Sequence, residues 1–127
     1  MFIDDSAFPL IRYRFSPKLS QDEVDEAVAA CARVFERGKR VAFVIDLSEL
    51  EDALSAQRRE HFAKLMATIQ KDADRLMLGA VYVAPSIISR GVIIALNWIR
   101  GKRPYPVVVV ASEAEADAIA RSWLAGS

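Results

Sequence analysis

Cysteine and histidine are nearly absent, with one of each in 127 residues. The single cysteine, Cys31, excludes an internal disulfide and fits a reducing compartment. It falls at a core-facing position of a predicted helix, where a buried small hydrophobic side chain is the simplest interpretation. The lone histidine, His61, lies inside another predicted helix without an obvious Asp partner, which disfavours a nucleophile triad. The sequence also lacks the cluster of His and Cys that a zinc site needs.

Net charge is absent as well, because 17 Lys and Arg balance 17 Asp and Glu. The global field therefore gives no reason to expect nucleic acid or an anionic membrane as the main partner, although local patches stay open. No apolar run approaches the roughly 18 residues of a membrane span. The acidic start, Met1–Asp5, differs from the basic start of a secretory signal. We expect a cytoplasmic protein.

Glycine is scarce, with five residues, and none of them forms a phosphate-binding loop after a strand. Nucleotide-binding folds of the Rossmann or Walker type are therefore unsupported. Glu49, Glu51 and Asp52 lack the spacing of a calcium loop and are interpreted as solvated loop acids. Asp46 follows a strand but has no evident base partner, so we expect it to organise the loop. These absences predict a protein that is not an enzyme and holds no cofactor or metal.

Apolar runs of strand length are present. Residues 40–48 form a run with no alternation, which is typical of a strand covered on both faces. Residues 76–84 are interpreted as another interior strand, and residues 107–110, again uniformly apolar, as the last strand. Residues 10–15 alternate instead, with Ile11, Tyr13 and Phe15 on one side, as in a half-exposed strand. Phe2-Ile3 is interpreted as a short partner strand for it.

Helical patterns separate these runs. Ser20–Glu23 and Ser112–Glu115 have the S-x-x-E form of a capping box and predict helices over 20–37 and 112–124. Ser55 is the expected N-cap of a helix that continues to Ala73, and residues 86–100 form a further one. The alternation of strands and helices predicts one α/β domain over residues 1–127, with a mainly parallel sheet of four or five strands flanked by about four helices.

The strand end Val44-Ile45-Asp46-Leu47-Ser48, followed by Leu54-Ser55-Ala56, resembles the STAS domain of anti-sigma factor antagonists and sulfate transporters. The order of elements agrees over nearly the whole chain. With Arg90-Gly91 and the late helix ending near Trp123-Leu124, the layout is similar to stand-alone bacterial STAS-like and SEC14-like proteins.

The resemblance implies a non-catalytic regulatory domain that binds a protein partner, with homodimer formation left open. It places Ser55 at the family's phosphorylation switch. Leu54, Ala56 and Gln57 depart from the family pattern around it, and the alternative is that Ser55 serves only as an N-cap. The partner-binding loop would comprise Asp46, Ser48, Glu49, Glu51, Asp52, Arg58 and Arg59.

The helix over 86–100 is more apolar than one buried face requires. The surplus predicts an interface or an apolar-ligand helix, with Ile87, Arg90, Ile94 and Trp98 as its candidate residues. Since the related SEC14-like fold holds lipids, the alternative function is a carrier or sensor of a small apolar ligand. Ser86, Ser89 and Arg90 open this helix either as an anion site or, more simply, as a cap with a surface arginine.

Overall fold

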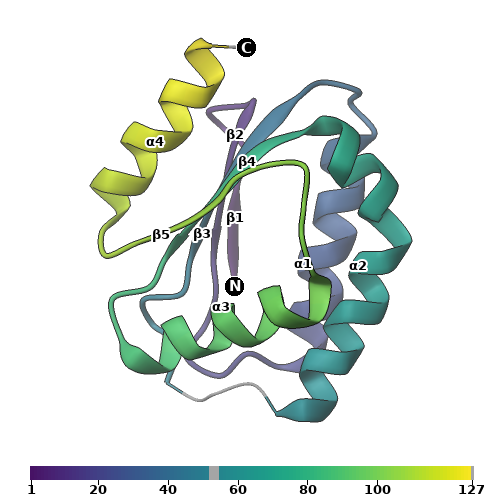
Figure 1. Ribbon diagram of the computed structural model, residues 1–127, viewed down its shortest axis with the longest axis vertical. Helices are drawn as coiled ribbons and strands as arrows, with labels where there is room; N and C mark the ends of the chain where they lie inside the picture. Colours follow the sequence, from purple (N-terminus) through teal and green to yellow (C-terminus); the bar gives the residue numbers. More distant parts are fainter. Residues whose placement is uncertain (52–54, 127) are drawn as a thin grey trace.

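A computed structural model describes residues 1–51 and 55–126, with the side chains of 95–100 excluded. Strands and helices alternate along most of the chain (Figure 1). In chain order they are β1 (Phe2–Asp4), β2 (Leu10–Arg14), α1 (Gln21–Phe35), β3 (Val41–Asp46), α2 (Ala56–Leu76), β4 (Met77–Val83), α3 (Ile87–Arg100), β5 (Val107–Val110) and α4 (Glu113–Ala125).

The sheet contains five strands in the order β1-β2-β3-β4-β5, the same as their order in the chain. Strand β1 pairs antiparallel with β2, and all the other pairs are parallel. Parallel neighbours need a crossover connection, and α1, α2 and α3 supply one each. The predicted fold class, a mainly parallel α/β sheet with four helices, is confirmed.

The two faces of the sheet are covered unequally (Figure 1). On one face, Ile11, Phe43 and Tyr82 belong to a large core that also takes buried residues from α1, α2 and α3. On the other face, Val44 and Val81 belong to a smaller core closed by α4. Alternate residues of a strand point to opposite faces, which explains why β3 and β4 are apolar throughout.

The helix ends carry the capping residues that the sequence predicted. The Ser20 and Ser112 hydroxyls accept from the backbone N–H of Glu23 and Glu115, at 3.2 and 3.3 Å, in the N-cap geometry. Gly38, just after α1, has a φ of +72°, a left-handed conformation that glycine adopts without steric cost.

Strand β5 is uniformly apolar, as the sequence indicated, although it is not an interior strand. It is the edge of the sheet, and its residues are partly exposed, with Val109 at 43%. Uniform apolarity identifies a strand but does not locate it in the sheet, because an edge strand between two helical layers also needs apolar side chains. Within the described part of the chain, no helix is long and apolar enough to cross a membrane.

Candidate functional site

A cavity of about 80 Å³ lies between the sheet and the layer of α1, α2 and α3. Small side chains leave the space, since Ala27 of α1 and Ala80 of β4 line it beside much larger neighbours. The rest of the wall is mainly aliphatic and aromatic, and it includes Phe15, Leu19, Val24, Val28, Phe43, Leu47, Phe62, Met66, Met77 and Val92. Such a space is too apolar to hold ordered water well and suits an apolar guest.

Tyr13 and Cys31 contribute polar groups to this wall. The Tyr13 hydroxyl donates to the Ala27 carbonyl at 3.3 Å and lies 3.1 Å from the Cys31 Sγ. Burial, with the nearby thiol of Cys31, raises the pKa of Tyr13 above its ordinary value, so the phenol stays protonated. Cys31 packs against the large core as predicted, and its thiol also belongs to the cavity wall.

Helix α3 presents two faces of opposite exposure. Val92 and Ile93 are buried against the large core, and Val92 reaches the cavity. Ile87 and Ile94, by contrast, are 90% and 68% exposed. The surplus of apolar residues predicted for this helix is therefore real, and part of it is at the surface. Trp98, the fourth predicted residue of this group, has a side chain outside the described part of the structure.

Side-chain hydrogen bonds stabilise the start of α3. The Ser86 hydroxyl accepts from the Ser89 N–H at 3.0 Å and lies 2.8 Å from the Ser89 hydroxyl. Ser89 is fully buried, and Arg90 donates through Nε to the Ala84 carbonyl at 2.9 Å. This arrangement is a cap with an anchored arginine, and no observation here supports the anion site.

Asp46 lies at the carboxyl end of β3, as predicted, and is 4% exposed. One carboxylate oxygen accepts from the Ser48 N–H at 2.8 Å, which organises the following loop. The other lies 3.5 Å from Nε of Arg14. Asp46 is therefore an internal support of the predicted loop, whereas Ser48, Glu49 and Glu51 are exposed on it.

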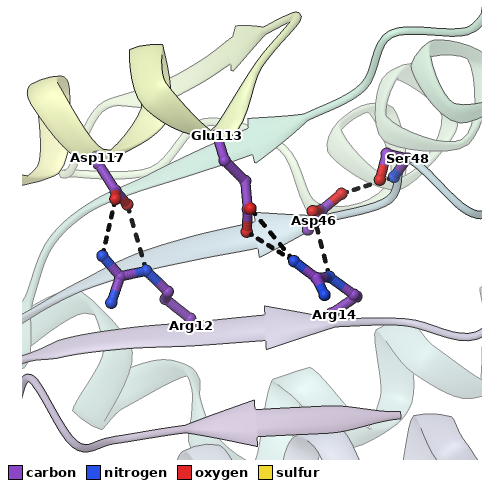
Figure 2. A network of polar contacts seen from close by, with 6 residues as sticks. All are labelled: Arg12, Arg14, Asp46, Ser48, Glu113 and Asp117. Carbon is purple, nitrogen blue, oxygen red and sulfur yellow. Dashed lines mark hydrogen bonds and ion pairs between the residues drawn. The ribbon is translucent and has the colours of Figure 1, made fainter.

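Sequence reasoning missed a polar network between the sheet and α4 (Figure 2). Arg14 of β2 reaches both Asp46 and Glu113 of α4, and the Glu113 carboxylate raises the pKa of the Arg14 guanidinium. Arg12, two residues earlier, forms a two-pronged ion pair with Asp117, at 2.8 and 3.3 Å. The alternation in residues 10–15 placed both arginines on one face, but only the fold reveals their partners.

Ser55 is the N-cap of α2, and its hydroxyl accepts from the Arg58 N–H at 3.1 Å. The Arg58 guanidinium donates to the Leu19 carbonyl at 2.9 Å, so it joins α2 to the segment before α1. Ser55 and Arg58 are exposed, and Arg59 is half-buried. Asp52, also predicted for this loop, lies outside the described residues.

His61 has a partner that the sequence did not reveal. Its Nε2 lies 2.6 Å from an Asp25 carboxylate oxygen, which links α2 to α1. The interpretation that His61 lacks an Asp partner is wrong, because the two residues are 36 positions apart and only helix packing brings them together. Both side chains are partly exposed, at 32% and 50%.

Across residues 1–51 and 55–126, no group of three or more His, Cys, Asp or Glu side chains is arranged to hold a metal ion. The structure thus contains three separate candidate features: the cavity, the exposed face of α3, and the loop that leads to Ser55. The loop and α3 were predicted from the sequence, whereas the cavity's wall was not.

No protein-family model matches the chain, and no curated protein matches it significantly. The resemblance to STAS-like domains therefore stays a prediction from the order of elements and the quoted segments.

Proposed function

We propose that the protein is a non-catalytic carrier or sensor of a small apolar ligand. The observation that supports this function is the cavity of about 80 Å³ with its almost wholly apolar wall. Protein cores are normally close-packed, with few voids larger than a water molecule. An apolar void loses dispersion contacts that a guest of suitable shape would restore.

The cavity's size limits the class of ligand. It is about half the volume of an engineered apolar cavity of roughly 150 Å³ that binds benzene or xenon. The expected guest is therefore a short alkyl group, or the end of a longer chain. Met66 and Met77 line the wall, and methionine side chains adapt readily to the shape of a neighbour.

Xenon and 1-butanol are suitable probes for this proposal. We expect both to shift the methyl resonances of Met66 and Met77 in carbon-13 NMR spectra, with saturation, while the methyl groups around α4 stay unchanged. Unchanged Met66 and Met77 resonances at several atmospheres of xenon would refute the proposal.

A matched pair of variants locates the binding. Ala27→Leu places additional carbons in the cavity and should abolish the xenon shifts. Ala29→Leu makes the same change two residues along the same helix, at an exposed position, and should leave them intact. Equal xenon binding by the two variants would place the guest elsewhere.

A second candidate function is the partner-binding loop with Ser55 as a switch. It is supported by the exposure of Ser55 at the N-terminus of α2, a few residues after the exposed acids Glu49 and Glu51 in the sequence. A phosphate there would add about −1.5 to −2 charge near the positive end of the helix. We rank this function second because the Arg58 guanidinium is already engaged with Leu19.

A further inference from the structure

We propose that the outer face of α3 docks on an anionic lipid bilayer. The docking face consists of Ile87, Ile88 and Ile94 with the neighbouring cations Arg90 and Lys102. This surface is separate from the cavity and goes beyond ligand binding. It stands on the exposure of the isoleucines and on the basic character of the chain segment that carries them.

The isoleucines are exposed to an unusual degree. Ile87 is 90% exposed, Ile94 is 68% and Ile88 is 44%. Ile87 and Ile94 are seven residues apart, two turns of helix, and so lie on one side of α3. Large exposed apolar side chains gathered on one element commonly mark a contact with a protein or membrane.

The charge within the chain segment that carries this face is of one sign. From position 76 to position 112 the sequence contains no Asp or Glu, although the whole chain carries 17 of them. The cations of this stretch are Arg90, Arg100, Lys102 and Arg103. Arg90 and Lys102 are exposed, at the two ends of the helix. Zero net charge for the whole chain thus conceals a basic, apolar segment.

Apolar side chains flanked by cations are the features with which an interfacial helix binds lipid. Its apolar side chains enter the boundary between headgroups and acyl chains, while Lys and Arg meet the anionic headgroups. The core of a protein–protein interface is instead enriched in aromatic residues, Met and Arg, which the described part of this face supplies only through Arg90.

The position of α3 agrees with this partner. The helix lies in the lower part of the molecule in Figure 1, where it packs beside α2. Its inner face contributes Val92 to the cavity wall. A bilayer against the outer face would lie one helix diameter from the cavity. The bilayer would then be the natural source of an alkyl guest.

Vesicle sedimentation with the full chain tests the proposal. We expect binding to vesicles of phosphatidylcholine and phosphatidylserine in a 7:3 ratio, and at least tenfold weaker binding to phosphatidylcholine alone. Raising the salt from about 0.05 to 0.5 M should weaken binding to the anionic vesicles, because it screens the cations. The absence of binding to anionic vesicles at low salt would overturn the proposal.

Variants of the exposed side chains test which surface binds the vesicles. Ile87→Ser with Ile94→Ser should weaken vesicle binding at least tenfold, and Lys102→Gln should weaken it severalfold. The controls are Phe2→Ser, which removes another exposed apolar side chain, and Lys71→Gln, which removes an exposed cation from α2. Since all these side chains are exposed, circular dichroism should show unchanged folding. Equal loss in control and test variants would overturn the assignment.

Two further outcomes separate this proposal from its alternatives. A dimer in vesicle-free solution that Ile87→Ser with Ile94→Ser dissociates would overturn it in favour of a second copy on the same face. Xenon binding, measured without vesicles, reports on the cavity alone. Vesicle binding without xenon binding would therefore support docking while refuting the ligand function, and the reverse result would do the opposite.

Discussion

At the scale of single residues, Gly79 leaves no room for a larger side chain. A Cβ atom added there would lie 2.5 Å from a ring carbon of Trp123, closer than packed carbon atoms approach each other. The indole of α4 therefore packs directly on the β4 backbone. We expect Gly79→Ala to lower the free energy of unfolding by about 1–3 kcal/mol, the usual cost of overpacking. Urea denaturation measures this change in the free energy of unfolding.

Gly91 is the matched control, because an added Cβ there meets no atom within 4 Å. It lies inside α3, where alanine is favoured over glycine by about 0.8–1.0 kcal/mol. Gly91→Ala should therefore raise the free energy of unfolding. If both substitutions shift it in the same direction, the packing of Trp123 on Gly79 is not what limits position 79.

Variants at Ser55 distinguish a structural role of this residue from a regulatory one. Ser55→Ala removes the side-chain acceptor for the Arg58 N–H and should cost about 0.5–2 kcal/mol of stability. Ser55→Asp keeps an acceptor and should cost much less. Thermal denaturation measures both, with Ser112→Ala as the corresponding change at the start of α4. Equal losses for Ala and Asp would contradict the cap.

The switch hypothesis is tested by the same Ser55→Asp variant in a quantitative pull-down from the source cell. A changed affinity for a captured partner, with stability retained, would support regulation at Ser55. Unchanged affinity would leave the residue as a helix cap.

At the scale of elements, α4 is held by apolar packing and by ion pairs to β2. The Arg12 and Asp117 side chains are only 23% and 32% exposed, and their contact has two prongs. We expect a double-mutant cycle of Arg12→Gln and Asp117→Asn to give a coupling of about 0.5–1 kcal/mol. The more exposed pair Arg75–Asp72, within α2, should give about 0.2–0.5 kcal/mol. Reversed magnitudes would show that burial does not set the strength of these pairs.

Most elements could be predicted from the sequence because their signals are local. Capping serines fix helix starts, Gly38 fixes a helix end, and apolar runs fix strands to within a few residues. The partners of Arg12, Arg14 and His61 could not be predicted in this way. Each lies more than 30 positions away, and only the order of strands decides which helix covers which face.

The cavity is likewise beyond sequence reasoning. Ala27 and Ala80 are ordinary small core residues in their own elements. They leave a space only because the fold places both around one cavity, with Ala27 on the helical side and Ala80 on the sheet side. The exposure of Ile87 and Ile94 is the intermediate case, since a surplus of apolar residues on the helix was evident but its outward side was not.

At the scale of the whole molecule, Glu23 makes stability depend on pH. It accepts from the Ser16 hydroxyl and lies 2.9 Å from the amino group of Met1. Partial burial raises the pKa of Glu23, but these contacts outweigh it, so the pKa falls below its usual 4.5. A carboxylate with a lowered pKa stabilises the fold above its ordinary pKa, and this stability is lost as the pH falls through the lowered value.

We therefore expect Glu23→Gln to lower the Tm at pH 7 and to lower it progressively less as the pH falls below about 4.5. Ser16→Ala, which removes one of the donors, should show a smaller difference of the same sign. Scanning calorimetry between pH 3 and 7 measures both. A Tm difference that grows on acidification would contradict the assignment.

The unequal covering of the sheet has a consequence for synthesis on the ribosome. Three crossovers place α1, α2 and α3 on one face, so that core can close as soon as β5 has been made. The other face, with Leu10, Val44 and Val81, has no cover until residues 113–125 leave the exit tunnel. For that interval the nascent chain carries a half-covered apolar sheet, which is the surface that chaperones bind and that aggregation begins from.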